Sequence, residues 1–200
     1  DLLRKITDTP ITIDEREKQK SIYKDASSDI LSDGFATLFL NRVNFSGILK
    51  GGPIGGLFQN GLYKIDCRFN KSEIKRKIEN IAQLNDRISV YNCDASDLII
   101  NRLKDQINTS FFNIDPPYVI KGSQLYTNFF RESDHRKLEK VITKHLSTTH
   151  WIVTYDDCDL VKEIYHRYHM LEYEIQHNAG GSVKGKELVI TNMPNDSLVW

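Results

Sequence analysis

The sequence has no apolar run that approaches the ~20 residues of a membrane-spanning helix. Its first residues, Asp-Leu-Leu-Arg-Lys, also lack the apolar core of a signal peptide. We therefore expect a cytoplasmic protein with no membrane partner. Cysteine is scarce: there are three, with no Cys-x-x-Cys pair. Disulfide frameworks and zinc sites need paired cysteines, so we expect reduced thiols and no metal.

An excess of charge of one sign is also missing. The 27 Lys and Arg residues balance the 27 Asp and Glu residues, which argues against a generic coat protein for nucleic acid. The local balance differs at residues 41–78, where eight basic residues stand against two acidic ones. Phosphate binding needs such a local surface rather than a basic chain. An ordinary solvated face would carry the same charges, so both interpretations stay open.

Hydrophobic periodicity predicts alternating helices and strands after a polar beginning. Residues 1–33 have the pattern of a loop and an amphipathic helix, and five glycines make residues 50–61 a loop. Ser72 and Ser133 are expected to cap the helices that follow them. Strands are expected at 88–91, 110–114, 151–155, 168–176 and 186–192, and the other helices at 95–108 and 157–167.

This alternation indicates an α/β fold. Two of the strands are almost continuously apolar, which is typical of a mostly parallel sheet covered by helices on both faces. The last two strands are separated by Gly180 and Gly181, so we expect an antiparallel hairpin at the edge of the sheet.

The motif that carries chemistry is Asp115-Pro116-Pro117-Tyr118, directly after the apolar strand that ends at Ile114. In open α/β sheets, ligands bind beyond the carboxyl ends of the strands. Each proline lacks a backbone donor and restrains the residue before it, which leaves the carbonyl groups of Asp115 and Pro116 free. The alternative is a proline turn that ends a buried strand beside a surface aspartate.

Such acceptors suit methylation of an exocyclic amine on a base. The amine is a poor nucleophile because its lone pair is delocalised into the ring. The Asp115 carboxylate and the Pro116 carbonyl would bind its two hydrogens and stabilise the positive charge that develops. The ring of Tyr118 would stack on a base swung out of the duplex. This chemistry requires no metal and no covalent intermediate.

The chain resembles the Dam-type family of adenine-specific DNA methyltransferases, whose catalytic motif is Asp-Pro-Pro-Tyr. Residues 41–47 (Asn-Arg-Val-Asn-Phe-Ser-Gly) resemble the start of the part that contacts DNA, and 59–63 and 68–71 continue it. Residues 92–95 (Asn-Cys-Asp-Ala) correspond to the segment that binds the adenine of the cofactor. The resemblance implies a Rossmann-like sheet, S-adenosylmethionine as methyl donor, and duplex DNA with a flipped adenine as substrate.

The resemblance also implies roles for individual residues. It implies that residues 115–118 are catalytic and that Asp94, Ala95 and Asp115 bind the cofactor. Asp94 would equally serve as a helix N-cap. Arginine and asparagine side chains read guanine and adenine edges, but they also contact phosphates, so the two roles stay open for the residues concerned. The expected DNA contacts are Arg42, Asn44, Ser46, Gln59, Asn60 and Lys121, the last in a loop that either closes over DNA or is an ordinary surface loop.

A glycine-rich turn between a strand and a helix, which a nucleotide-like cofactor needs, is the feature that the sequence lacks. The Gly-Gly-Pro-Ile-Gly-Gly run at 51–56 has no clear strand before it and no helix directly after it. We therefore expect a sheet that is incomplete at its N-terminal side. We also expect that a missing N-terminal segment or partner chain supplies the loop, and that the 200 residues alone do not methylate DNA.

The expected organisation has three parts: an N-terminal helical or linker segment (1–33), a small DNA-recognition module (34–71) and a catalytic α/β domain (72–200). The function that these features favour is site-specific adenine methylation of DNA, of the restriction-modification type. The alternative is an inactive DNA-binding fragment or regulatory remnant of such an enzyme.

Overall fold

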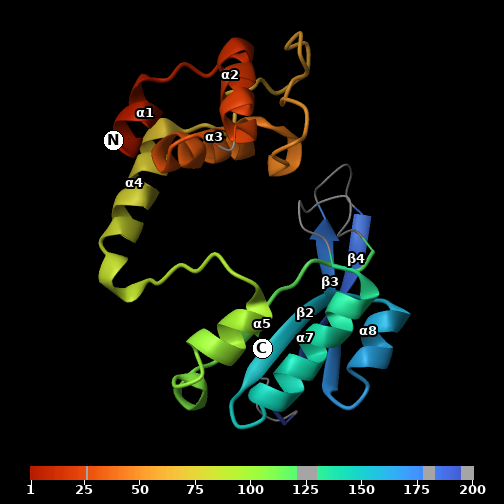
Figure 1. Cartoon of the computed structure of the whole chain (residues 1–200). Helices are drawn as coiled ribbons and strands as arrows, with labels where there is room; N and C mark the ends of the chain where they lie inside the picture. The colour runs from red at the N-terminus through yellow and green to blue at the C-terminus, as the bar shows by residue number, and fades with distance from the viewer. Residues whose placement is uncertain (26, 121–129, 178–182, 195–200) are drawn as a thin grey trace. The chain divides into compact units, whose positions relative to one another are not determined.

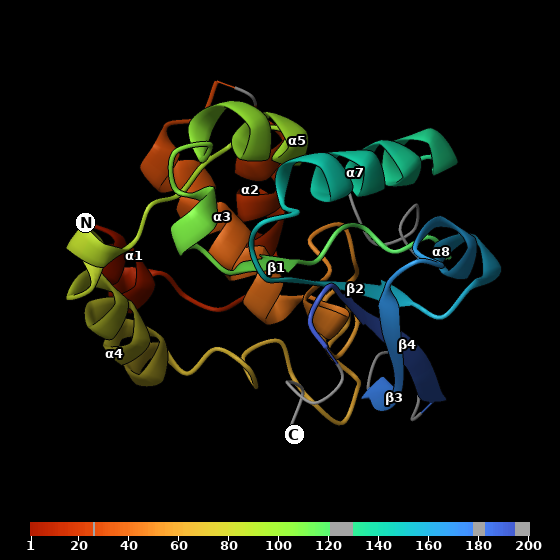
Figure 2. The same cartoon turned by 90° about the horizontal axis from the view of Figure 1, so that it is seen from below.

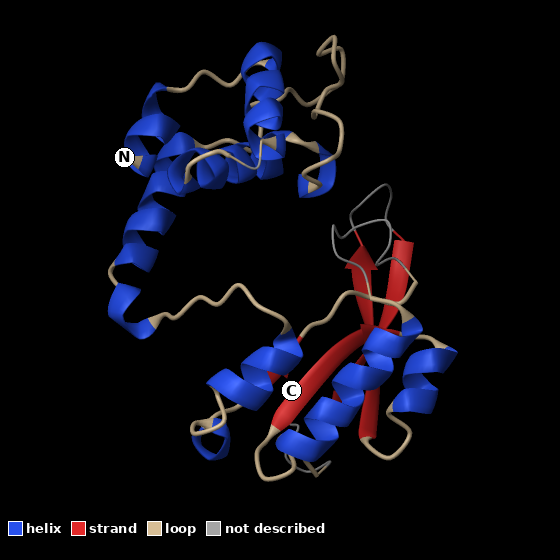
Figure 3. Ribbon diagram, in the orientation of Figure 1, coloured by secondary structure: helices blue, strands red, loops and turns tan. Residues whose placement is uncertain are grey.

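The computed structural model describes residues 1–25, 27–120, 130–177 and 183–194. The chain forms two compact units, Asp1–Ser89 and Val90–Trp200, called here the N-terminal and C-terminal units. The first is built from helices and loops and the second contains the sheet (Figures 1 and 3). Within the described ranges, no helix has the length and apolar character needed to cross a membrane. All three cysteines are free thiols.

The N-terminal unit contains more helix than expected. Three of its helices begin at capping side chains, Thr12, Asp29 and Asn70, each of which accepts a backbone N–H of the first turn. The expectation that Ser72 caps the fourth helix is wrong, because Asn70 occupies that position. The helices are α1 (Leu2–Asp8), α2 (Ile13–Lys24), α3 (Ile30–Val43) and α4 (Lys71–Ala82), with short 3₁₀ turns η1 (Phe45–Gly47) and η2 (Asn85–Arg87).

The buried core of this unit draws on α1, α3, α4 and the loop before α4, and Ile13 of α2 packs against it. Phe39 of α3 packs between Phe35, at 5.9 Å between ring centroids, and Phe69, at 5.3 Å. Ile74 brings α4 onto the same core. The division into compact units therefore differs from the expected boundaries after residues 33 and 71, because α4 packs with the N-terminal helices. The buried members are Ile6, Phe35, Phe39, Val43, Ile65, Phe69 and Ile74.

The C-terminal unit contains a four-stranded sheet with the order β1-β2-β4-β3. Strands β1 and β2 are parallel, and β4 pairs antiparallel with both β2 and β3. The expected edge hairpin is confirmed, with β4 as its inner strand. The elements are α5 (Ala95–Asp97), η3 (Leu98–Arg102), η4 (Ile107–Thr109), β1 (Phe112–Ile114), α7 (Glu132–His145), β2 (Trp151–Asp156), α8 (Asp159–Ile164), β3 (His169–His177) and β4 (Val183–Thr191).

One face of the sheet forms the core of the C-terminal unit. Trp151, Val153 and Tyr155 alternate inward along β2, and α7 and α8 pack over them (Figures 1 and 2). Two expectations are corrected here. The sheet has one parallel pair and two antiparallel pairs rather than a mostly parallel order. In the described part of this unit, the helices of the core cover one face rather than both.

The strand expected at 88–91 and the long helix expected at 95–108 are also wrong. Within the part of the chain that the structure describes, residues 88–91 belong to no strand, and Val90 is 89% exposed, so the apolar pattern there does not mark a buried strand. The helix is a single turn followed by a π-helical turn that ends at Arg102. Ser133 does not cap α7, which begins one residue earlier, at Glu132.

Candidate active site

Asp115 lies where the motif predicts, directly beyond β1. The parallel register pairs Ile114 with Val153, so the next residues, Asp115 and Thr154, are also neighbours. The Thr154 hydroxyl donates a hydrogen bond of 2.8 Å to Oδ1 of Asp115. The Asp115 side chain is exposed, whereas Pro116 is buried and anchors the turn. The carboxylate is thus oriented by β2 and still open to a ligand.

The chain after the two prolines is held by Asp156, the last residue of β2. Its Oδ1 accepts the backbone N–H of Val119 at 2.9 Å, and its Oδ2 accepts that of Ile120 at 2.7 Å. Asp156 itself is buried. Two charge-assisted hydrogen bonds to adjacent N–H groups fix the backbone on the far side of Tyr118.

Tyr118 lies near Glu187 of β4. Burial raises the pKa of the Tyr118 phenol, and the nearby Glu187 carboxylate raises it further. Tyr173 of β3 donates a hydrogen bond to Glu187 Oε2, at 2.5 Å. Tyr118 and Glu187 also line one cavity of about 290 Å³, together with Asp156 and Lys186.

A second cavity, of about 640 Å³, brings the two halves of the expected site together. Residues 92–95 line it on one side and residues 114–117 on the other, with Phe130 as an aromatic wall. Asp94 and Asp115 therefore face one space, as the resemblance implies. The cavity offers carboxylate acceptors beside apolar walls, which suits an aromatic ring that carries an amine.

Asp94 is the N-cap of α5. Its Oδ1 accepts the backbone N–H groups of Ser96 at 3.0 Å and Asp97 at 3.3 Å. The N-cap role is thereby confirmed. Lys137 Nζ approaches the same oxygen at 3.9 Å. Ala95, the first residue of α5, lines the cavity beside it.

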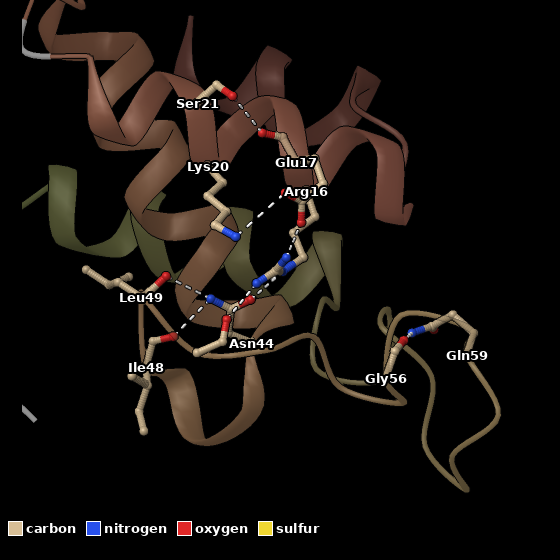
Figure 4. A network of polar contacts seen from close by, with 10 residues as sticks. Arg16, Glu17, Lys20, Ser21, Asn44, Ile48, Leu49, Gly56 and Gln59 are labelled. Carbon is tan, nitrogen blue, oxygen red and sulfur yellow. Dashed lines mark hydrogen bonds and ion pairs between the residues drawn. The ribbon is translucent and has the colours of Figure 1, made fainter. Parts of the chain in front are cut away.

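Asn44 has a structural position in the N-terminal unit rather than an exposed one (Figure 4). It is fully buried, and its Oδ1 accepts a hydrogen bond of 2.7 Å from Nε of Arg16. Its Nδ2 donates to the carbonyls of Ile48 and Leu49 at 2.9 and 3.0 Å. Reading of a base edge by Asn44 is therefore corrected, because no group of this side chain is left for a base.

Arg42 and Gln59 are also engaged within the N-terminal unit. The Nε and one terminal nitrogen of Arg42 both donate to the Arg68 carbonyl. These two bonds occupy one edge of the guanidinium group, the group with which arginine pairs with guanine. The Gln59 side chain donates to the carbonyls of Ile54 and Gly56 and accepts the N–H of Ile65. These side chains close loops within this unit, and their contact with DNA stays a prediction.

Ser46 and Asn60 are the expected DNA contacts that stay exposed. Ser46 has a positive φ of 53° and lies at a sharp turn after α3. Lys50 is exposed on the following loop. Lys121 lies outside the described residues.

The glycine run at 51–56 forms a folded loop. Pro53 bridges to Asn44, and Gly61 donates its N–H to the Gly55 carbonyl at 3.1 Å. A Cβ at Gly61 would lie 2.8 Å from the Gly55 Cα, so the close approach of the two backbones requires glycine. The glycines therefore serve loop closure, and no helix begins within this run.

Four residues of these sites were missed by sequence reasoning: Thr154, Asp156, Glu187 and Arg16. Thr154 and Glu187 lie on predicted strands, and Asp156 directly follows one, where a polar residue at a strand end was a usable signal. Glu187 and Arg16 gave no local signal, because their partners lie 14 and 28 residues away.

Comparison with known proteins supplies the family. A comparison with curated proteins gives no match. The model of the D12 class N6 adenine-specific DNA methyltransferases matches residues 8–178, which include the Asp94 segment, the Asp115-Pro-Pro-Tyr turn and both strands that hold it. The chain therefore belongs to the D12 class N6 adenine-specific DNA methyltransferase family, whose members are enzymes that methylate adenine in DNA.

Proposed function

We propose that this protein transfers a methyl group from S-adenosylmethionine to the exocyclic amine of an adenine flipped out of duplex DNA, with residues 115–118 as its catalytic turn. The observation that carries the proposal is the shared cavity: Asp94 and the Asp115-Pro-Pro segment line one space beyond β1. A cytoplasmic role in restriction-modification belongs to the same proposal.

The residues act on the amine by orientation and electrostatics. Asp115, fixed by Thr154, accepts one N–H of the amine, and the Pro116 carbonyl accepts the other. Both acceptors would stabilise the positive charge that grows on nitrogen as the methyl group leaves the sulfonium sulfur for the amine, and the Asp115 carboxylate would accept the proton that the methylated amine then loses. The ring of Tyr118 stacks on the flipped base. S-adenosylmethionine, when bound, supplies an electrophilic methyl group.

The cavity fits the adenine part of that cofactor. Asp94 has a second carboxylate oxygen besides the one that caps α5, and it can accept the adenine amine. Phe130 and Pro116 provide apolar contacts for the ring. We propose that Asp94 and Ala95 hold the cofactor beside Asp115. We further propose that the C-terminal unit is part of a Rossmann-like sheet.

Residues 34–71 are proposed to contact DNA. Ser46 and Asn60 are exposed, and Lys50 adds a positive charge near Ser46. Large apolar side chains are also exposed on the same loop, with Phe58 at 87% and Leu62 at 88%. Solvent-exposed apolar groups beside basic ones suit a surface that meets both bases and phosphates.

A second function, a DNA-binding piece without activity, is favoured by one observation. In the described part of the N-terminal unit, the glycine run at 51–56 forms a closed loop rather than a strand-turn-helix cofactor site. If the protein is instead active, we propose that a missing segment or partner chain supplies the glycine-rich loop.

Transfer of labelled methyl groups separates the two functions. The full gene product, and the 200 residues with and without added upstream segment, are incubated with labelled S-adenosylmethionine and duplex DNA. We expect N6-methyladenine from the complete enzyme and at least ~100-fold less from Asp115→Ala, the loss typical of one preorganised acceptor. Near-normal transfer by Asp115→Ala would contradict the mechanism. Absence of methyladenine from the complete enzyme, with DNA binding intact, would support the inactive alternative.

A further inference from the structure

Arg16 is a buried cation that holds both ends of one turn. It lies on α2 and is only 2% exposed, whereas the turn follows α3. Its Nε donates to Asn44 Oδ1 at 2.7 Å (Figure 4), and one terminal nitrogen donates to the Gly51 carbonyl at 2.6 Å. The other terminal nitrogen pairs with the carboxylate of Glu17. A single guanidinium group therefore closes the base of residues 44–51, called here the clamped turn.

A guanidinium group in a buried position costs free energy, because hydrogen bonds must offset the loss of its hydration. Apolar side chains of similar size often stabilise a fold equally well. They cannot hold two acceptors at a set separation, which the planar fork of arginine does. The contacts of Arg16 therefore indicate a role in fixing a conformation, in addition to its contribution to stability.

The clamped turn is also braced by bonds of its own. Asn44 Nδ2 donates to two carbonyls of the turn at 2.9 and 3.0 Å, and the N–H of Phe45 donates to the Gly52 carbonyl at 2.9 Å. Ser46 has a positive φ of 53°, which residues other than glycine rarely adopt. Such a conformation persists only where the surrounding contacts fix it. These bonds indicate a turn with one defined shape.

The outer side of the clamped turn is open to solvent and carries residues that are proposed to meet DNA. Ser46 and Lys50 are exposed, and Phe45 is 55% exposed. A hydroxyl group, a cation and an aromatic ring suit contacts with both bases and phosphates. A rigid element loses less conformational entropy on binding than a flexible one, and it adapts to fewer wrong partners. The fixed base of the turn thus favours selective binding.

We propose that Arg16 is a positioning residue for DNA recognition: its guanidinium group fixes the clamped turn so that Ser46 and Lys50 meet the duplex in one register. The proposal rests on the proposed function, since it deepens the proposed DNA contact of residues 34–71. Arg16 touches no DNA in this role. Its effect passes through the two ends of the turn, and it therefore acts on sequence selectivity rather than on binding of S-adenosylmethionine.

The first test measures selectivity in the complete enzyme. Arg16→Lys keeps the charge but not the fork, and Arg16→Met removes the charge while it keeps a long side chain. Each variant methylates DNA that carries no N6-methyladenine, and sequencing that detects this base gives the preferred target. We expect methylation of sites that differ from the target by one base pair to rise about tenfold relative to the target itself.

Partial unfolding cannot imitate this result. Selectivity is a ratio of kcat/KM values for two sequences, and that ratio does not depend on the amount of active enzyme. A purely structural role of Arg16 would lower methylation of all sequences alike. Affinity for S-adenosylmethionine should stay within about twofold of the wild type, since the residues that line the cofactor cavity belong to the C-terminal unit.

Limited digestion with trypsin measures the turn itself. Lys50 is exposed, and its bond to Gly51 lies inside the clamped turn. Cleavage of such a bond proceeds from locally opened molecules, so its rate follows their population. We expect the new N-terminus at Gly51 to form about tenfold faster in both Arg16 variants than in the wild type. Mass spectrometry of the fragments measures the rate.

Arg4→Lys is the matched control, because it makes the same change at an arginine of α1 whose side chain is 78% exposed. Its target sequence and its cleavage at Lys50 should equal those of the wild type. An unchanged target in both Arg16 variants would overturn the proposal. Unchanged cleavage at Lys50 would also overturn it, because the turn would then keep its shape without the guanidinium group.

If neither Arg16 variant folds, Asn44→Asp decides. It keeps an acceptor for Arg16 but removes the two donors to the carbonyls of the turn, so it should relax the target in the same way. An unchanged target in Asn44→Asp would overturn the proposal. A wild type that binds duplex DNA but makes no methyladenine would refute the proposed function instead. Selective binding from a pool of duplexes then tests the role of Arg16.

Discussion

The hydroxyl of Thr154 donates a hydrogen bond to the carboxylate of Asp115 across the parallel pair β1 and β2, at 2.8 Å. The register explains the contact, because Ile114 pairs with Val153 and the following residues face the same side. The bond leaves the second oxygen of Asp115 for a substrate amine. Thr154 thereby selects one orientation of a carboxylate that is otherwise exposed on a turn.

Replacement of Thr154 by valine should therefore slow methyl transfer while the fold persists. Valine keeps the shape and the strand preference but removes the donor, so the carboxylate loses its fixed orientation. We expect kcat to fall about tenfold, in line with roughly 1.5 kcal/mol for a hydrogen bond to a charged group. Single-turnover transfer measures the change. Thr154→Ser retains the hydroxyl and should be close to wild type; equal losses in both variants would contradict the role.

Asn44 should prove to be a stability residue. Its removal leaves the buried Arg16 Nε without an acceptor, and Arg16 is only 2% exposed. Asn44→Ala should lower the free energy of unfolding by about 2–4 kcal/mol, as expected for a buried charged group that loses a partner. Thermal unfolding measures the loss.

Asn60→Ala is the control for that change, since Asn60 is exposed and its side chain has no described contact in the N-terminal unit. It should alter stability by no more than about 0.5 kcal/mol. A stable Asn44→Ala protein that binds DNA with relaxed sequence preference would restore base reading by Asn44.

The sequence could predict the parts of the site that depend on local pattern. The apolar runs of β1 and β2 and the turn after Ile114 need only neighbouring residues, and all three are present. The edge hairpin followed from two strands around a glycine pair. Family resemblance added the pairing of residues 92–95 with the catalytic turn, which the shared cavity supports.

Features that depend on partners distant in the sequence could not be predicted from the sequence alone. The extended segment at 88–91 has the composition of a strand, but a strand forms only where another strand pairs with it. Asn44 resembles a residue that reads a base edge, because its polarity alone does not reveal that it is buried and hydrogen-bonded to Arg16. Glu187 lies within a predicted strand, and only the fold brings Tyr118 to it.

Asp94 offers a prediction that separates its two roles. Asparagine caps helices as well as aspartate does, so Asp94→Asn should keep the stability of the C-terminal unit. The same change removes the charge that attracts the adenine amine, so S-adenosylmethionine should bind about tenfold more weakly. Asp94→Ala should lose the affinity and in addition about 1 kcal/mol of stability. Calorimetric binding and thermal melting measure the two effects; full affinity in Asp94→Asn would limit Asp94 to capping.

His135 should make the stability of the C-terminal unit depend on pH. Its ring is buried, with Nδ1 at 2.8 Å from the Tyr155 hydroxyl and the Phe130 ring at 5.3 Å. Among the described residues, its Nε2 has no hydrogen-bond partner. Burial lowers the pKa of His135 below its ordinary value of 6.5, although the charges of Asp156 and Asp134 oppose the shift. The folded state therefore holds a neutral ring.

The sign of the pH effect follows from this difference. Below about pH 6.5, His135 binds a proton in the unfolded chain but not in the folded chain. The free energy of unfolding therefore falls as the pH drops. His135→Gln cannot bind that proton and should show a flatter profile between pH 7 and 5. Urea unfolding followed by tryptophan fluorescence, which reports the core around Trp151, measures the slope. His166→Gln replaces an exposed histidine and is the matched control. An unchanged slope in His135→Gln would assign the pH dependence to the carboxylates that face this ring.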